Sequence, residues 1–229
     1  MLKSGRQAWY DVVMATRSGQ GRRLEVDEVK RGLILASARR VFEADGLDGA
    51  SLRAIAAAAG YTPAALYFHF ESKEAIYAEL LRASLAELGR AVDRAIARAR
   101  EPSARLRAAA LAFFRFYDAN PRDLDLGFYL LRGGMKPHGL GRARDEMLNA
   151  ALADALRPIS EAALALGARP VEARMLVVDV FAHASGLLLM AHTGRIRMFN
   201  ASAPRLMERF VDRAIAGFAA KPRRGRRDA

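Results

Sequence analysis

One stretch, residues 51–74, constrains the fold of this chain more than any other. It reads SLRAIAAAAGYTPAALYFHFESKE and contains its own start and stop signals for helices. Ser51 can cap a first helix, and Gly60 can end it because glycine adopts the left-handed backbone at low cost. Thr62 can cap a second helix with Pro63 at its first position, where the missing N–H costs nothing. The pattern predicts two helices joined by a three-residue turn, which is a helix-turn-helix.

The helices of this motif are rich in small side chains, which let two helices cross steeply because their backbones can approach closely. The alanines concerned are Ala56, Ala58, Ala59 and Ala65. The second helix is expected to end near Phe70, and Ser72 can cap a third helix. An ordinary alanine-rich helical hairpin, with no role in DNA binding, would share this much of the pattern.

The aromatic run LYFHF at residues 66–70, followed by SKE at residues 72–74, is a more specific signal. Together with the Thr-Pro helix start, it resembles the DNA-binding domain of the TetR family of transcriptional regulators, over roughly residues 29–81. The resemblance implies an N-terminal three-helix DNA-binding domain, followed by a C-terminal helical domain that binds a small-molecule effector and forms a homodimer. It also implies double-stranded DNA with a palindromic operator as the partner.

By this resemblance the second helix, residues 63–70, is the recognition helix that enters the major groove. The residues predicted to bind DNA are Ser51, Arg53, Thr62, Pro63, Ala64, Ala65, Tyr67, His69 and Lys73. Side chains at the tip of this helix would contact bases, whereas Tyr67, His69 and Lys73 would bind phosphate oxygens. Arg53, in the preceding helix, would either read a base or remain solvated.

The aromatic run also has structural alternatives. Tyr67 and Phe68 could both be core aromatics, but neighbouring residues on a helix cannot face the same way. We expect Tyr67 to point outward and Phe70 inward. A lone histidine is more often structural than functional, so the role of His69 depends on the resemblance.

The composition argues against disulfide-linked, secreted and membrane proteins. The chain has 229 residues, 52% of them hydrophobic, and no cysteine, so disulfides and thiolate metal sites are excluded and a cytoplasmic protein is expected. No apolar run of signal-peptide length occurs near the N-terminus. The longest apolar run, residues 175–191, is short for a membrane span and contains Asp179 and His183. We expect it to form a buried helix of a soluble protein.

The formal net charge of +12 suits an anionic partner, but the excess lies outside the helix-turn-helix. Residues 1–82 contain 12 Lys/Arg against 10 Asp/Glu, residues 83–220 contain 20 against 14, and residues 221–229 contain 5 against 1. The prediction of DNA binding therefore depends on local pattern rather than on overall charge. The basic tail could bind phosphate or could be a solvated end.

Helical spacing continues along the whole chain without strand-like alternation, so the predicted fold class is all-α. We predict a flexible N-terminal arm over residues 1–26, the DNA-binding domain over 27–80, the effector and dimerisation domain over 81–220, and the basic tail over 221–229. Met14 is an alternative start. The first helix should end at Gly46. Further helices are expected over residues 72–100, 103–118, 141–166 with a kink or break at Pro158, 171–192 and 204–218.

Candidate ligand-binding residues lie in the second half. A pocket needs apolar walls and a few polar groups, and the residues predicted to line it are Phe113, Tyr117, Phe128, Met147, Asp179 and His183. Asp179 and His183 are four residues apart on a helix and can meet. They could form a buried strut, a polar anchor in the pocket or, least favoured, an acid–base pair. No phosphate loop, nucleophile elbow or metal-binding spacing occurs, so neither enzyme activity nor a cofactor is expected.

The predicted function is that of a homodimeric transcription repressor, released from its operator by a small molecule. By resemblance, the last two long helices would pair with those of a second copy in a four-helix bundle, where Ala182, Ala184, Ser185 and Gly186 allow close approach. The alternatives are an architectural DNA-binding protein without an effector and a helical enzyme that uses Asp179 and His183.

Overall fold

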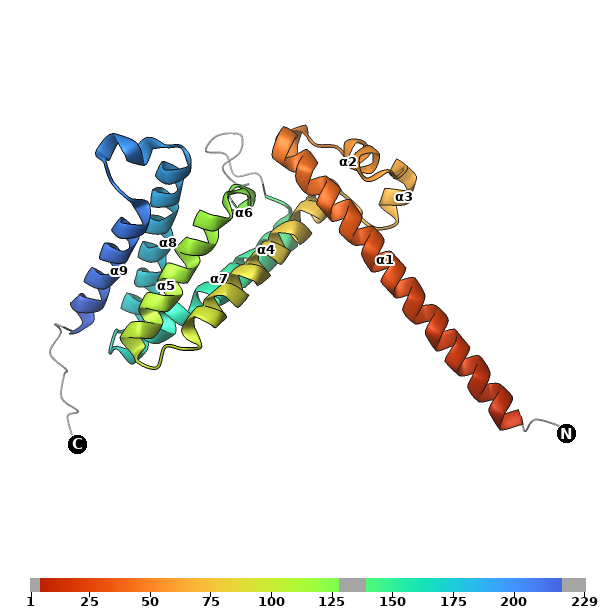
Figure 1. Cartoon of the computed structure of the whole chain (residues 1–229), viewed down its shortest axis with the longest axis horizontal. Coiled ribbons are helices and arrows are strands. Elements are labelled where there is room, and N and C mark those ends of the chain that lie inside the picture. Colours follow the sequence, from red (N-terminus) through yellow and green to blue (C-terminus); the bar gives the residue numbers. More distant parts are fainter. Residues whose placement is uncertain (1–4, 128–138, 220–229) are drawn as a thin grey trace. The chain divides into compact units, whose positions relative to one another are not determined.

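The computed structural model describes the backbone of residues 5–127 and 139–219, and the side chains of residues 27–127 and 139–218. All regular elements within these ranges are helical, which confirms the all-α fold class (Figure 1). The chain divides into two compact units, Met1–Leu80 and Leu81–Ala229.

The first helix, α1 (Gly5–Gly49), starts earlier than predicted. We expected a flexible arm over residues 1–26, but α1 extends back to Gly5. That stretch contains no proline, the residue that most strongly breaks a helix. Regular helix stops at Gly46 (φ 71°), as predicted, since only glycine adopts this conformation without strain.

The helix-turn-helix consists of α2 (Leu52–Ala59) and α3 (Pro63–Tyr67), and α4 (Lys73–Ile96) follows it. The three predicted caps are confirmed. The N–H groups of Ala54, Ala65 and Ala75 donate to the hydroxyl oxygens of Ser51, Thr62 and Ser72 at 3.1, 3.2 and 3.1 Å. Gly60 ends α2 in the left-handed conformation (φ 73°), and α3 ends at Tyr67, earlier than expected.

The first unit has a small apolar core into which α1, α2, α3 and α4 each contribute side chains. Its buried members include Ile34, Ala38, Phe42, Leu47, Ile55, Leu66, Phe70, Ile76 and Tyr77. The rings of Phe42 and Tyr77 meet edge to face with centroids 5.0 Å apart. Leu66 and Phe70 anchor α3 and the turn that follows it to this core, which fixes the outward face of α3.

The second unit is a helical bundle of α5 (Pro102–Ala119), α6 (Pro121–Gly127), α7 (Arg142–Ala165), α8 (Pro170–His192), the 3₁₀ helix η2 (Arg195–Phe199) and α9 (Ala203–Ala219), together with the second part of α4. Helix α5 packs against α7, α8 and α9, and α7 and α9 pack against α8 (Figure 1). Helix α7 continues through Pro158, where we expected a kink or break.

Helix α8 is the predicted apolar helix, and in the single chain it is only partly buried. It is the one helix of the described residues that is long and apolar enough to span a membrane by length and composition, and 28% of its most apolar stretch is buried. The prediction of a buried helix is therefore wrong for one face. Val171, Met175, Val178 and Leu189 are each more than half exposed.

Candidate nucleic-acid interface

The start of the recognition helix α3 is open to solvent. Thr62, Pro63 and Ala64 are exposed, and Ala65 is half-buried. The hydroxyl of Thr62 accepts the cap hydrogen bond from Ala65, and it still has a proton to donate to a base or a phosphate. The structure brings these predicted DNA-binding residues together at one end of one helix. The caps set the direction of that helix, and the buried Leu66 holds it in place.

The residues contributed by α2 lie at its N-terminal end. Ser51 uses its hydroxyl oxygen to cap the helix and is itself exposed. Arg53 is exposed, and it makes no ion pair with any residue in the described ranges. Its guanidinium is therefore available to a base or a phosphate.

The aromatic run divides between core and surface. Leu66 and Phe70, four residues apart, are 0% and 3% exposed, whereas Tyr67 is 59% exposed, as we expected. Phe68 is 89% exposed, so the alternative of a core aromatic is wrong for it. Once Leu66 and Phe70 are placed inside, helical spacing already puts Phe68 outside. An exposed phenylalanine beside a recognition helix can contact thymine methyl groups or sugars, so Phe68 joins the candidate residues.

His69 is half-buried next to this surface. Its backbone carbonyl oxygen accepts a hydrogen bond from Nη1 of Arg31 at 3.0 Å. A phosphate contact from its side chain remains a prediction.

Lys73 has a different role from the one that we predicted. All three N–H groups of its ammonium are used inside the first unit, so none is left for a phosphate. They donate to the carbonyl oxygens of Leu47, Asp48 and Ala50 at 2.8, 3.2 and 3.1 Å. These carbonyls lie at the end of α1 and in the connection to α2, where no helical N–H is available to them. Lys73 therefore ties the start of α4 to the end of α1.

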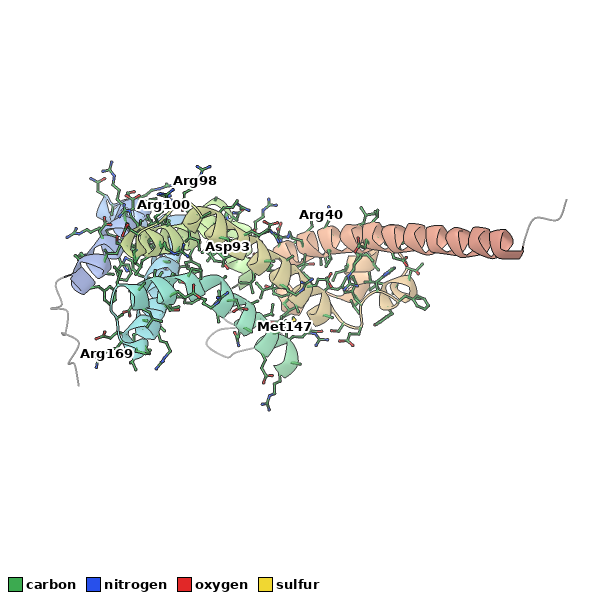
Figure 2. The ribbon with its side chains drawn as sticks, turned by 90° about the horizontal axis from the view of Figure 1, so that it is seen from below. Arg40, Asp93, Arg98, Arg100, Met147 and Arg169 are labelled. Carbon is green, nitrogen blue, oxygen red and sulfur yellow. The ribbon has the colours of Figure 1, made fainter. Side chains whose placement is uncertain are left out.

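The predicted ligand-pocket residues within the described ranges are divided between the buried core and the surface. Phe113 and Tyr117 are buried against each other, with ring centroids 5.3 Å apart, and Phe113 also contacts Phe181. Burial raises the pKa of the Tyr117 hydroxyl, and the charge of Asp123 adds to this shift. Phe128 lies outside the described residues. Met147 is 44% exposed on α7 (Figure 2). The two buried aromatics belong to the core rather than to a pocket.

Asp179 and His183 do not form the pair that their spacing allows. Asp179 is exposed, whereas the ring of His183 stacks on Phe210 of α9 with centroids 4.2 Å apart. Burial lowers the pKa of His183, partly offset by a hydrogen bond with the backbone of Leu206. The acid–base alternative is therefore wrong. Within the described residues, no group of three or more His, Cys, Asp or Glu side chains could hold a metal ion.

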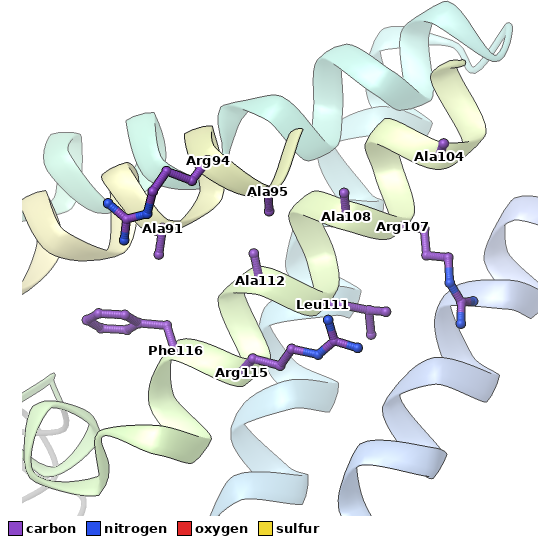
Figure 3. Close-up of a pocket in the computed structure, with 10 residues that line it drawn as sticks. All are labelled: Ala91, Arg94, Ala95, Ala104, Arg107, Ala108, Leu111, Ala112, Arg115 and Phe116. Atoms are coloured by element: carbon purple, nitrogen blue, oxygen red, sulfur yellow. The ribbon is translucent and has the colours of Figure 1, made fainter. Parts of the chain in front are cut away.

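An open groove lies elsewhere in the second unit, between α4 and α5 (Figure 3). Its volume is about 610 Å³, and its lining is mostly small and apolar: Ala91, Ala95, Ala104, Ala108, Leu111, Ala112 and Phe116, with Arg94, Arg107 and Arg115. Arg107 pairs with Asp212, and Arg115 pairs with Glu208 at 3.4 Å. Arg94 has no ion pair with any described residue, so it is the arginine of this lining that is available to a ligand.

A capped helix-turn-helix with an exposed helix start, followed by a helical bundle, defines the class of helix-turn-helix DNA-binding regulators. The family model for "Bacterial regulatory proteins, tetR family" matches residues 34–80, the part of the chain that contains this motif. Residues 34–80 of the chain therefore carry the DNA-binding domain of the TetR family of regulators.

Several known proteins are similar to this chain in sequence or in fold. The chain is 36% identical over 109 residues to the HTH-type transcriptional activator FasR of Mycolicibacterium smegmatis, a match that spans 48% of this chain and about half (49%) of that relative. A Rhodococcus sp. RHA1 protein of unknown function has a similar structure, with a TM-score of 0.65 and 28% identity over 82% of this chain and 94% of that one. The regulator FadR of Bacillus subtilis, solved with stearoyl-CoA, shares the fold at 14% identity, with a TM-score of 0.62 over 81% and 97% of the two chains.

Proposed function

We propose that this protein is a homodimeric regulator that binds a palindromic operator with one recognition helix α3 from each copy. The observation that carries the proposal is the exposed start of α3, where Thr62, Pro63 and Ala64 face solvent while Leu66 and Phe70 anchor the segment from behind. A helix held in this way can enter a major groove without rearranging the core. Because its target is genomic DNA, we expect it to act in the cytoplasm.

The proposed dimer uses the exposed face of α8. Val171, Met175, Val178 and Leu189 recur at intervals of three and four residues or their sums, which places them on one stripe of the helix. Ala182 and Gly186 continue this stripe, and nothing lies within 4 Å of a Cβ built on Gly186, so a second helix can approach closely. A contiguous apolar stripe of this kind on a soluble bundle is typical of a protein–protein interface. A second copy of α8 would cover it.

The proposed effector is an amphipathic anion that binds in the groove between α4 and α5. The alanine and phenylalanine lining suits an apolar chain, and Arg94 is available to an anionic group. The stearoyl-CoA in the structure of FadR is a ligand of this chemical class. Binding beside α4 would favour one position of that helix, which begins directly after the recognition helix, and so would change the spacing between the two α3 helices of the dimer.

We propose repression that this ligand relieves, because a change in the spacing of the two α3 helices would prevent both from reaching their half-sites at once. The similarity to FasR, which is named an activator, favours activation as a second candidate. Repression and activation differ in the direction in which a reporter gene responds when the protein is added. An architectural DNA-binding protein would show no preference for any sequence at any salt concentration.

The test combines DNA binding with ligand release. Stearoyl-CoA should lower the affinity of the full-length protein for DNA fragments that it selects from genomic DNA, and Arg94→Ala should weaken this response. The matched control is Arg98→Ala, which removes an exposed arginine close to the end of α4 and outside the groove lining. If Arg94→Ala and the control respond like the wild type, the groove is not the effector site. If no fragment is preferred, the regulator proposal itself fails.

A further inference from the structure

Arg31 on α1 makes three polar contacts and one aromatic contact in the first unit, and nothing in the sequence pattern marks it. Its Nε donates to Oε1 of Glu79 at 2.8 Å, and Nη2 pairs with Oε2 of the same carboxylate. Its Nη1 donates to the carbonyl oxygen of His69 at 3.0 Å. Its Cζ also lies 4.2 Å from the ring centroid of Phe70. All three nitrogens of one planar group are therefore engaged.

These contacts join three separate parts of the first unit. Arg31 belongs to α1, Glu79 belongs to α4, and His69 and Phe70 form the turn that ends the recognition helix. The carbonyl oxygens at the end of a helix lack helical partners and carry partial negative charge, so a cation there is favourable. A guanidinium has the forked geometry to bind a carboxylate with two nitrogens and a carbonyl with the third, which a lysine ammonium cannot reproduce.

The side chains next to the turn that Arg31 holds lie on the proposed DNA surface. His69 is held by Arg31 through its backbone, and Phe68 and Tyr67 are exposed immediately before it. Arg31 itself is 40% exposed and Glu79 20%, and the two side chains pair with each other while Arg31 also binds the turn. A fixed turn keeps Tyr67 and Phe68 in one orientation, whereas a loosened turn would let them move while the protein stays folded.

We propose that Arg31 is a positioning residue for sequence recognition. It fixes the end of α3 relative to α1 and α4, so the specificity of DNA binding depends on it although it does not touch DNA. The inference requires only that the protein binds DNA through α3. It is independent of whether an effector exists and of the direction of regulation.

The test uses full-length Arg31→Lys, with a duplex selected by the wild-type protein from a random library and a scrambled duplex of equal length. We expect the ratio of the two affinities to fall about tenfold, equivalent to about 1.4 kcal/mol. Affinity for the scrambled duplex and its salt slope should stay unchanged, because no phosphate contact is lost. Hydrogen exchange of the His69 and Phe70 amides, which both donate to the carbonyl of Leu66, should become faster in the free protein.

Two further variants test whether the loss of specificity comes from the contacts of Arg31. Glu79→Gln retains a hydrogen-bonding partner but removes the charge, and it should lower the specificity ratio less than Arg31→Lys. Arg157→Lys is the matched control, since Arg157 makes an exposed ion pair with Glu161 on α7. Circular dichroism establishes that each variant is folded at the assay temperature. A folded Arg31→Lys variant with the wild-type specificity ratio would overturn the proposal, and so would a salt slope lower by about one, which would make Arg31 a phosphate contact.

Discussion

The contacts of Lys73 differ between the sequence-based prediction and the structure. Its place in the SKE run suggested a phosphate contact, yet its ammonium is bound to three backbone carbonyls of its own domain. The difference arises because the acceptors lie about 25 residues earlier in the chain and are brought near only by the fold. Phe68 was a candidate for the core in the sequence, yet it is 89% exposed although Leu66 and Phe70, two residues away on either side, are buried.

Replacement of Lys73 by methionine should therefore lower stability rather than weaken phosphate binding. Removing a charged donor from partly buried carbonyls costs about 1–3 kcal/mol, measured as the free energy of unfolding in urea. Lys30→Met is the matched control, because Lys30 makes only an exposed pair with Asp27 at 3.9 Å, and its change should be within about 0.5 kcal/mol. A Lys73→Met variant of normal stability whose salt slope for DNA falls by about one would restore the phosphate role.

Phe68 and Phe70 offer a direct comparison of surface and core. Phe70→Ala should destabilise the protein by about 3–5 kcal/mol, because a buried ring is lost from the core. Phe68→Ala should leave the free energy of unfolding within about 0.5 kcal/mol of the wild type and weaken binding to the selected duplex. Unfolding curves and DNA titrations on the same preparations separate the two effects. Equal DNA affinity for Phe68→Ala and wild type would remove Phe68 from the interface.

Arg53 is a candidate for reading a base in addition to the residues at the start of α3. Since it has no ion-pair partner in the described ranges, Arg53→Ala should not cost stability. On the selected duplex it should cost about 1–3 kcal/mol and relax the preference at one symmetric pair of positions. Loss of affinity by the same factor on every sequence would reassign Arg53 to the DNA backbone.

For the helices, the caps and end points were predicted well from the sequence, whereas the packing of one helix against another was not. The caps of α2, α3 and α4 and the stop at Gly46 depend on a residue and its neighbours within three or four positions, so the sequence contains them. The pocket prediction depends on which face of α5 points toward α8, a tertiary feature that no local pattern encodes. Phe113 and Tyr117 lie on that buried face, whereas the alanines that line the groove lie on the other.

The contact between α8 and α9 predicts a dependence of stability on pH. His183 stacks on Phe210, and burial holds its pKa below the ordinary value of 6.5. The unfolded state therefore binds a proton more readily, so stability is full above about pH 6.5 and falls as the pH drops from there toward the folded pKa. Urea titrations between pH 5 and 8, roughly the range in which histidine titrates, should show this slope, and His183→Phe should reduce it. An unchanged slope in that variant would assign it to other groups.

The exposed stripe of α8 is the proposed dimer interface. Val178→Glu places a charge in the middle of the stripe and should convert the dimer to monomers in sedimentation experiments, because an unpaired carboxylate cannot be buried at an apolar interface. Asp179→Glu is the matched control, since it changes the neighbouring exposed position without changing the charge. A dimeric Val178→Glu protein would place the interface elsewhere.

For the molecule as a whole, the fold and the DNA-binding unit follow from sequence patterns, whereas the effector and the operator depend on surfaces that no local pattern encodes. The two units have separate cores, so recognition by α3 and ligand binding in the groove can be altered independently. Helix α4, from Lys73 to Ile96, contains the boundary between the two units.

In the proposed complex, two copies of α3 read one palindromic DNA site. The most direct measurement is selection from a random duplex library by the full-length protein, followed by titration of the enriched duplex. We expect an inverted repeat whose half-sites are centred about one helical turn, roughly 34–36 Å, apart or at a multiple of that spacing. We also expect an even number of protomers on each duplex and a preference over scrambled DNA of at least about 10³. Enrichment of no inverted repeat, with equal affinity for all duplexes, would contradict the proposed complex.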